Sequence, residues 1–212
     1  MSDRQSTDDL IRALAAAPAP APFNPVVPAG AMFGLAAGGL AAFLVVFGLR
    51  PDLGAAWQDL GVQAKSLLPA VLCALALWLV LRASRPGTGL TLWPLALPLG
   101  AVLAMALLRL AGAEGALRAE VLGQTALACL TSITALSLVP LVAGILLLRR
   151  AASTRPVLTG ALAGVAVSAG VASGYALHCT EDSPLFFGTW YGLAIGMVAL
   201  VGAWLGHRFL RW

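Results

Sequence analysis

The chain has 212 residues, of which 60% are hydrophobic and 10% charged, with a formal net charge of +4. A water-soluble domain carries about 25% charged residues, so this composition excludes an ordinary soluble globular fold. It leaves too much apolar surface for a single core and favours a protein that lies in a membrane.

The first 17 residues, "MSDRQSTDDLIRALAAA", form a polar head that predicts one short amphipathic helix. Ser6 or Thr7 can cap it, and two acids follow in the first turn, where the helix dipole favours negative charge. A helix of about 11 residues is marginal alone in water, so it needs a partner to complete it. An unstructured tail is the alternative, but the pattern favours a peptide that recruits another protein.

Residues 18–28, "PAPAPFNPVVP", contain five prolines and predict an extended, semi-rigid linker. At about 3.1 Å per residue it reaches roughly 34 Å at most. The head resembles no secretory signal because Asp3, Asp8 and Asp9 occupy the place of a basic region. We therefore expect residues 1–22 to be retained.

Six apolar runs are long enough, or nearly so, to cross a bilayer, which needs roughly 20 residues. Backbone groups in lipid must pair within their own segment, so runs of this length predict helices. The predicted fold is an all-α integral membrane protein, with a six-transmembrane-helix bundle over 29–212 and a short N-terminal cytoplasmic helix. The expected spans are 29–49, 62–81, 90–108, 121–148, 157–177 and 185–205.

Glycines recur at four-residue spacing in several spans, as in Gly34 and Gly38, Gly160 and Gly164, and Gly202 and Gly206. Small residues at this spacing let membrane helices approach closely. We expect this packing to lie mainly within one chain rather than between copies.

Orientation follows from Lys and Arg in the short loops, which concentrate on the cytoplasmic side. With both termini inside, nine of the 13 basic residues are cytoplasmic: Arg4, Arg12, Arg82, Arg85, Arg149, Arg150, Arg155, Arg208 and Arg211. The predicted location is the bacterial inner membrane, with both termini in the cytoplasm. The positive charge then lies in cytoplasmic loops beside the anionic lipid of the bilayer, and we expect no direct nucleic-acid binding.

The midplanes of the predicted spans lack Asp, Glu, Lys and His, the residues that transport pathways usually contain. Phosphate-binding loops, HExxH and nucleophile elbows are also absent from the sequence. We therefore expect no enzyme and no cofactor.

Two of the three cysteines are expected near the outer interface, Cys129 in the fourth predicted span and Cys179 after the fifth. Such a pair can be a structural disulfide in an oxidising compartment, or two unrelated thiols. It can also be a metal site, for which His178, Glu181 and Asp182 offer further ligands, although the spacing matches no zinc pattern. A sensor of oxidants, metals or electrophiles, with those residues as neighbours and the cysteines as transient metal ligands, is the third interpretation.

Three stretches together carry a family resemblance: "YALHCTEDSPLFFGTWYGLAIG", "CLTSITALSLVPL" and the N-terminal "TDDLIRALA". The chain resembles the negative regulator of sigma F family of six-span bacterial anti-sigma factors. The resemblance implies an extracytoplasmic-function sigma factor as the partner, released on a periplasmic signal, with Cys129 and Cys179 as the signal-sensing pair. By position it further implies sigma-binding residues in the head and in the loop between the fourth and fifth spans: Asp8, Asp9, Leu10, Ile11, Leu14, Arg149, Arg150 and Arg155.

Two alternatives remain at this point. A small-solute transporter predicts uptake and no cytoplasmic partner, and a membrane thiol oxidoreductase predicts turnover of quinone or thiol substrates. Neither explains a proline-spaced cytoplasmic helix.

Overall fold

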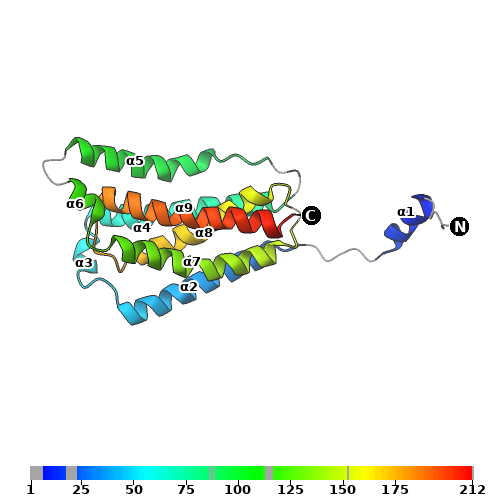
Figure 1. The fold of residues 1–212 in the computed structure, drawn as a ribbon, viewed down its shortest axis with the longest axis horizontal. Helices are drawn as coiled ribbons and strands as arrows, with labels where there is room; N and C mark the ends of the chain where they lie inside the picture. The colour runs from blue at the N-terminus through cyan, green and yellow to red at the C-terminus, as the bar shows by residue number, and fades with distance from the viewer. Residues whose placement is uncertain are drawn as a thin grey trace.

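The computed structural model describes residues 7–17, 23–85, 87, 89–112, 117–151 and 153–211, and all regular structure within these ranges is helical. The head of residues 7–17 forms α1 (Thr7–Ala16), and the bundle follows (Figure 1). Its elements are α2 (Val26–Phe47), α3 (Leu53–Ala56), α4 (Leu60–Ala83), the 3-10 turn η1 (Trp93–Leu95), α5 (Ala96–Ala111), α6 (Leu117–Leu122), α7 (Ala126–Leu148), α8 (Pro156–Tyr175) and α9 (Pro184–Phe209).

Among the described residues, six helical segments are long and apolar enough to span a membrane, in the order that the sequence predicts. They are α2, α4, η1 with α5, α6 with α7, α8 and α9. The first begins at Val26, so the prediction that the linker extends to residue 28 is wrong at its last three residues. Proline is tolerated in a first helical turn, where its missing N–H would be unpaired anyway, so Pro28 does not prevent this start. Residues 18–22 of the linker and 1–6 of the head lie outside the described ranges.

The fourth predicted span, 121–148, is broken rather than continuous. α6 ends at Leu122, and Gly123 then adopts a left-handed φ of 54°, which glycine reaches at little cost. A Cβ at Gly123 would collide with the ring of Phe186, so the turn also requires the smallest residue. α7 restarts at Ala126, which places Thr125 just before that helix and Cys129 in its first turn.

α8 is the central helix of the bundle and the most deeply buried of the six. It packs against α9, α4, α7 and α2, whereas α5 lies at one edge against α9 and α4 (Figure 1). Alanine and glycine occupy much of α8, so neighbouring backbones come close. At Gly160 a Cβ would collide with the carbonyl of Gly202, and at Gly206 with the carbonyl of Pro156. The predicted glycine packing within one chain is therefore confirmed for the α8–α9 pair.

Other glycines of the same spacing are not used in this way. Around Gly34, Gly38, Gly192 and Gly196 no atom lies within 4 Å of an added Cβ. Close packing inside the chain thus explains only part of the glycine pattern.

The two ends of the bundle differ. The start of α2, the α7–α8 loop (residues 149–155) and the end of α9 lie at one end, which we call the terminal end (Figure 1). The loop between α8 and α9 (residues 176–183), called the thiol loop, lies at the other end with α3 and α6, which we call the thiol end.

Candidate functional site: a buried thiol pair

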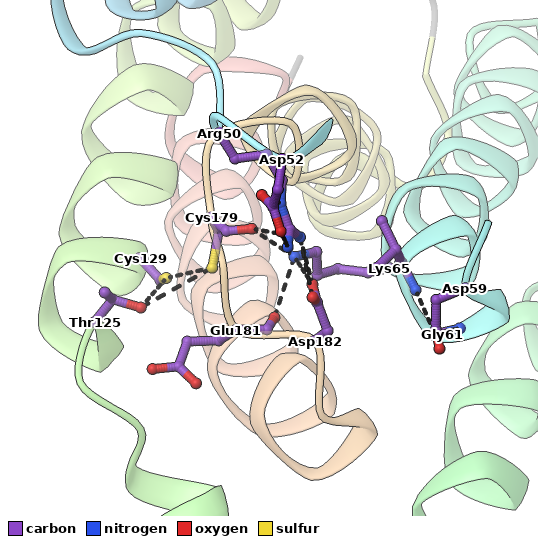
Figure 2. A network of polar contacts seen from close by, with 11 residues as sticks. Arg50, Asp52, Asp59, Gly61, Lys65, Thr125, Cys129, Cys179, Glu181 and Asp182 are labelled. Atoms are coloured by element: carbon purple, nitrogen blue, oxygen red, sulfur yellow. Dashed lines mark hydrogen bonds and ion pairs between the residues drawn. The ribbon is translucent and has the colours of Figure 1, made fainter. Parts of the chain in front are cut away.

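The structure brings the two predicted cysteines together at the thiol end. The Sγ atoms of Cys129, on α7, and Cys179, in the thiol loop, lie 3.6 Å apart (Figure 2). Both are free thiols, and their exposed fractions are 0% and 3%. A disulfide has an S–S length of about 2.05 Å, so the sulfurs lie in contact without a bond, about 1.5 Å from bonding distance.

The surroundings of the thiol pair are mostly apolar and aromatic. Phe186, Phe187, Tyr175 and Tyr191 belong to the same buried cluster as the two cysteines. Thr125 adds one hydroxyl, whose oxygen lies 3.6 Å from the Cys129 sulfur and 4.0 Å from the Cys179 sulfur. The pair is therefore shielded from water and has few polar neighbours.

Local sequence explains the turn that places Cys179. The carbonyl of Tyr175 accepts from the backbone N–H groups of His178 and Cys179, which closes the end of α8. Ser183 then caps α9 by accepting from the N–H of Leu185, and Pro184 occupies its first turn. A helix end followed within eight residues by a capped start holds the thiol loop in one short path.

Lys65 of α4 holds the thiol loop through hydrogen bonds. Its side chain is 0% exposed, and its ammonium donates to the carbonyls of Cys179 at 2.6 Å and Glu181 at 3.1 Å. A third hydrogen bond, of 2.6 Å, joins it to the carboxylate of Asp182. All three donors of the ammonium are thus used, which satisfies a charge that would be costly to bury alone.

Arg50, which follows α2, is the second buried cation, and we call Arg50 and Lys65 the cation pair. Nη1 of Arg50 donates to both carboxylate oxygens of Asp182, at 2.8 and 3.0 Å. Nε and Nη2 donate to Asp52, at 2.8 and 2.9 Å. Figure 2 shows dashed lines from both cations to the carboxylate of Asp182.

Burial, hydrogen bonds and the buried cations shift the pKa values of two side chains in the thiol loop, Asp182 and Cys179. Burial raises the pKa of Asp182, but hydrogen bonds from Arg50 and Lys65 outweigh it and hold that pKa below its ordinary value. The hydrogen bond with the Cys129 thiol, together with the charge of Lys65, lowers the pKa of Cys179 against the effect of burial. A thiol with a lowered pKa is more often a thiolate, which is the reactive form.

The three predicted neighbours of the thiol pair have other partners. His178 donates from Nδ1 to the carbonyl of Gly48 at 2.8 Å, since a carbonyl can only accept. Glu181 accepts from the N–H of Gln124 at 2.7 Å, and Asp182 pairs with the cations. Within the described ranges, three or more His, Cys, Asp or Glu side chains nowhere gather as they would around a metal ion.

The residues proposed to bind a sigma factor lie on exposed surfaces. The helix predicted in the head is confirmed as α1, whose acids Asp8 and Asp9 lie in its first turn and whose residues are all exposed. Arg149, Arg150 and Arg155 are also exposed, at the terminal end.

Sequence reasoning missed Arg50, Lys65 and Asp52: the charge count left the two cations among the four basic residues on the outer side, and Asp52 received no role. A lysine five residues after the helix start, followed by a long apolar run, was the available signal, because such a charge needs a partner to be buried. Its partner lies 117 positions away, so the pairing itself could not be read locally.

These observations define the class of protein: a helical protein with six helices of membrane-spanning length, a buried thiol pair at one end and an exposed amphipathic helix. The chain belongs to the negative regulator of sigma F family, whose model matches residues 13–212. It is an anti-sigma factor, and the family implies a sigma factor as its partner. A regulatory protein is therefore favoured over the transporter and thiol oxidoreductase alternatives.

Two relatives match the chain over most of its length. The anti-sigma-F factor of Caulobacter vibrioides is 34% identical over 213 residues, which cover 97% of this chain and 99% of that protein. The probable anti-sigma-F factor of Azospira oryzae is 38% identical over 181 residues, covering 84% of each chain. No solved structure matches the chain.

Proposed function

We propose that this anti-sigma factor lies in the bacterial inner membrane, holds an extracytoplasmic-function sigma factor on the cytoplasmic side, and releases it when the thiol pair reacts on the periplasmic side. The observation that carries the proposal is the 3.6 Å separation of two buried sulfurs on different elements. Two thiols at that separation can be joined by one oxidation or bridged by one metal ion with little movement.

The charge distribution supports the orientation. The terminal end carries most of the described arginines: Arg82, Arg85, Arg149, Arg150, Arg155, Arg208 and Arg211. The thiol end carries most of the described acids of the bundle: Asp52, Asp59, Glu120, Glu181 and Asp182. By the positive-inside rule, this distribution supports a cytoplasmic terminal end and a periplasmic thiol pair.

The head supports the partner. Leu10, Ile11 and Leu14 are exposed although they are the large apolar residues of α1. A helix of 10 residues gains most of its stability from packing its apolar face, so a bound sigma factor would both cover these side chains and stabilise α1.

The chemistry of release balances with hydrogen peroxide as the oxidant. Two thiols lose two electrons and two protons and form one S–S bond, while the peroxide is reduced to two waters. Moving occupancy from about 99:1 to 1:99 requires a difference of roughly 5.5 kcal/mol between the two states. A covalent bond between α7 and the thiol loop is a change of that size, whereas a surface hydrogen bond is not.

The test is a reporter gene that depends on the sigma factor, in cells expressing Cys129→Ser, Cys179→Ser or both. We expect each variant to lose the response to peroxide, metal and electrophile stress. Cys73→Ser is the matched control, since Cys73 lies on α4 beside Gly170 and outside the thiol cluster. A full response in the double variant would refute sensing by the thiol pair.

The head is tested separately. Leu14→Asp places a charge on the apolar face of α1 and should abolish copurification of a sigma factor with the solubilised protein. Arg12→Ala, at an exposed position in the same helix, should leave copurification intact. Equal recovery with both variants would show that α1 is not the contact.

A further inference from the structure

α2 connects the thiol loop to the head, because its C-terminal end touches the loop and its N-terminal end follows the linker. The N–H of Arg50, three residues beyond α2, donates to the carbonyl of Leu177 at 3.0 Å. The guanidinium of Arg50 binds Asp182, and the ring of His178 binds the carbonyl of Gly48. Backbone and side-chain contacts thus fasten this end of α2 to the thiol loop on both sides of Cys179.

α2 is also seated on both helices that position the thiols. Met32 fits against Gly144 of α7, and Leu40 fits against Gly174 of α8, in each case so closely that a Cβ on the glycine would collide with it. Cys129 is on α7, and Cys179 follows α8 directly. A change in the spacing of α7 and the thiol loop therefore alters the surface on which α2 rests.

The core holds α2 less firmly than it holds its neighbours. Of its 22 residues only Pro28, Met32 and Ala36 are buried, whereas α8 buries twelve of 20. Elements with few buried apolar contacts open or shift at the lowest free-energy cost. α2 is thus the more movable partner of this contact.

The α7–α8 loop is the competing route to the cytoplasmic side, and it is better packed. Ala151 and Ser153 are buried, the Ser153 hydroxyl lies 2.8 Å from that of Thr159, and the N–H of Ala151 donates to the carbonyl of Leu148. Such a loop resists a small displacement, because closely packed groups must move together.

We propose that a change in the thiol pair, from two thiols to a disulfide, shifts α2 and thereby affects the head. Arg50 and His178 couple the thiol loop to α2, and the contacts of Met32 with Gly144 and of Leu40 with Gly174 are those that change. Disulfide formation draws the sulfurs about 1.5 Å closer, and helix shifts of about 1–2 Å are typical of switching interfaces. The inference rests on the proposed function only for its output, sigma release; the motion of α2 is measured without a sigma factor.

The experiment uses the full-length chain in lipid nanodiscs, treated with hydrogen peroxide, which oxidises two thiols to a disulfide and is reduced to two waters. Mass spectrometry after alkylation counts the remaining thiols, and hydrogen–deuterium exchange follows the backbone amides of residues 26–35. In the unmodified protein we expect loss of two alkylatable thiols and a change of about threefold or more in the exchange rate of these amides.

Arg50→Gln with His178→Gln should form the disulfide yet leave exchange at residues 26–35 unchanged. Asp182 keeps Lys65 in this variant, so the loop retains one of its cations. Arg109→Gln is the matched control, because it breaks the pair with Glu120 at the same end without touching α2. It should respond as the unmodified protein does.

Leu40→Ala tests the contact of α2 with Gly174 of α8 without altering the thiol loop. Leu35→Ala, on the exposed face of α2, is its control. We expect Leu40→Ala alone to uncouple disulfide formation from exchange. Disulfide formation that changes exchange equally in the coupling variants and their controls, or that leaves α2 unchanged in the unmodified protein, would overturn the inference. A protein that moves α2 but releases no sigma factor would instead contradict the proposed function.

Discussion

Asp182→Asn removes the charge that neutralises Lys65, the most deeply buried cation among the described residues. Lys65 is 0% exposed, and Asp182 is its acidic partner, at 2.6 Å. Breaking a buried ion pair by removing one partner costs about 3–5 kcal/mol. The asparagine oxygen can still accept a hydrogen bond, so we take the lower end, about 3 kcal/mol, or roughly 6–12 °C in Tm for a chain of this length.

The assay is thermal unfolding of the detergent-solubilised protein, followed by tryptophan fluorescence. Asp52→Asn is the matched control: it removes an acid bonded to the same Arg50, but this side chain is 57% exposed. An exposed pair contributes about 0–1 kcal/mol, so its Tm should fall by less than about 4 °C. The double variant Lys65→Met with Asp182→Asn should be more stable than Asp182→Asn alone, because no unpaired charge is left buried. Equal effects of Asp182→Asn and Asp52→Asn, or no recovery in the double variant, would refute the argument.

Three further predictions follow from the same contacts. The pKa of Asp182 is lower in the folded state than in the unfolded chain, so its contribution to the free energy of unfolding is complete above about pH 4. This contribution is lost as pH falls through the lower pKa of the folded state. Tm measured down to about pH 2 should show the loss in the unmodified protein and not in Asp182→Asn. Lys65→Met should raise the pH at which peroxide oxidises Cys179 at half its maximal rate, measured by quenched alkylation; an unchanged midpoint would mean that Lys65 does not stabilise the thiolate. Gly160→Ala should lower the free energy of unfolding by about 1–3 kcal/mol through overpacking, and so lower Tm. Gly38→Ala, which adds a methyl group in open space, should be neutral or slightly stabilising. Similar Tm values for both variants would contradict the α8–α9 packing.

Hydropathy and charge were sufficient to predict six helices in their order, because each span is an apolar run with its own internal hydrogen bonds. A pair formed by Cys129 and Cys179 was one of the interpretations that the sequence allowed, since both lie near the same end of consecutive spans, and the structure brings the two sulfurs to 3.6 Å. The break after α6 did not follow from the sequence, because the left-handed conformation of Gly123 is a property of the folded backbone that hydropathy does not report.

The cation pair was beyond prediction for a different reason. Arg50 and Lys65 were assigned to the polar outer side, where charged residues usually remain exposed. Their burial arises from the thiol loop folding over the ends of α2 and α4, which joins Asp182 to positions 132 and 117 residues away. Local periodicity contains no information on such long-range contacts.

The burial of the thiol pair determines how an oxidant can reach it. A solute in water cannot reach sulfurs that are 0% and 3% exposed unless the thiol loop opens first. The contacts that oppose opening are the bonds of Lys65 and Arg50 to the loop and the hydrogen bond of Glu181 to Gln124. When opening and closing are fast compared with the reaction, the reaction rate follows the population of the open state. Under the proposed function, these bonds would therefore set the concentration of oxidant at which the sigma factor is released. Weakening them, as in Asp182→Asn, should therefore increase the rate of peroxide oxidation through access at the same time as it lowers Tm, and a variant that loses stability without reacting faster would show that the oxidant reaches the thiols by another path.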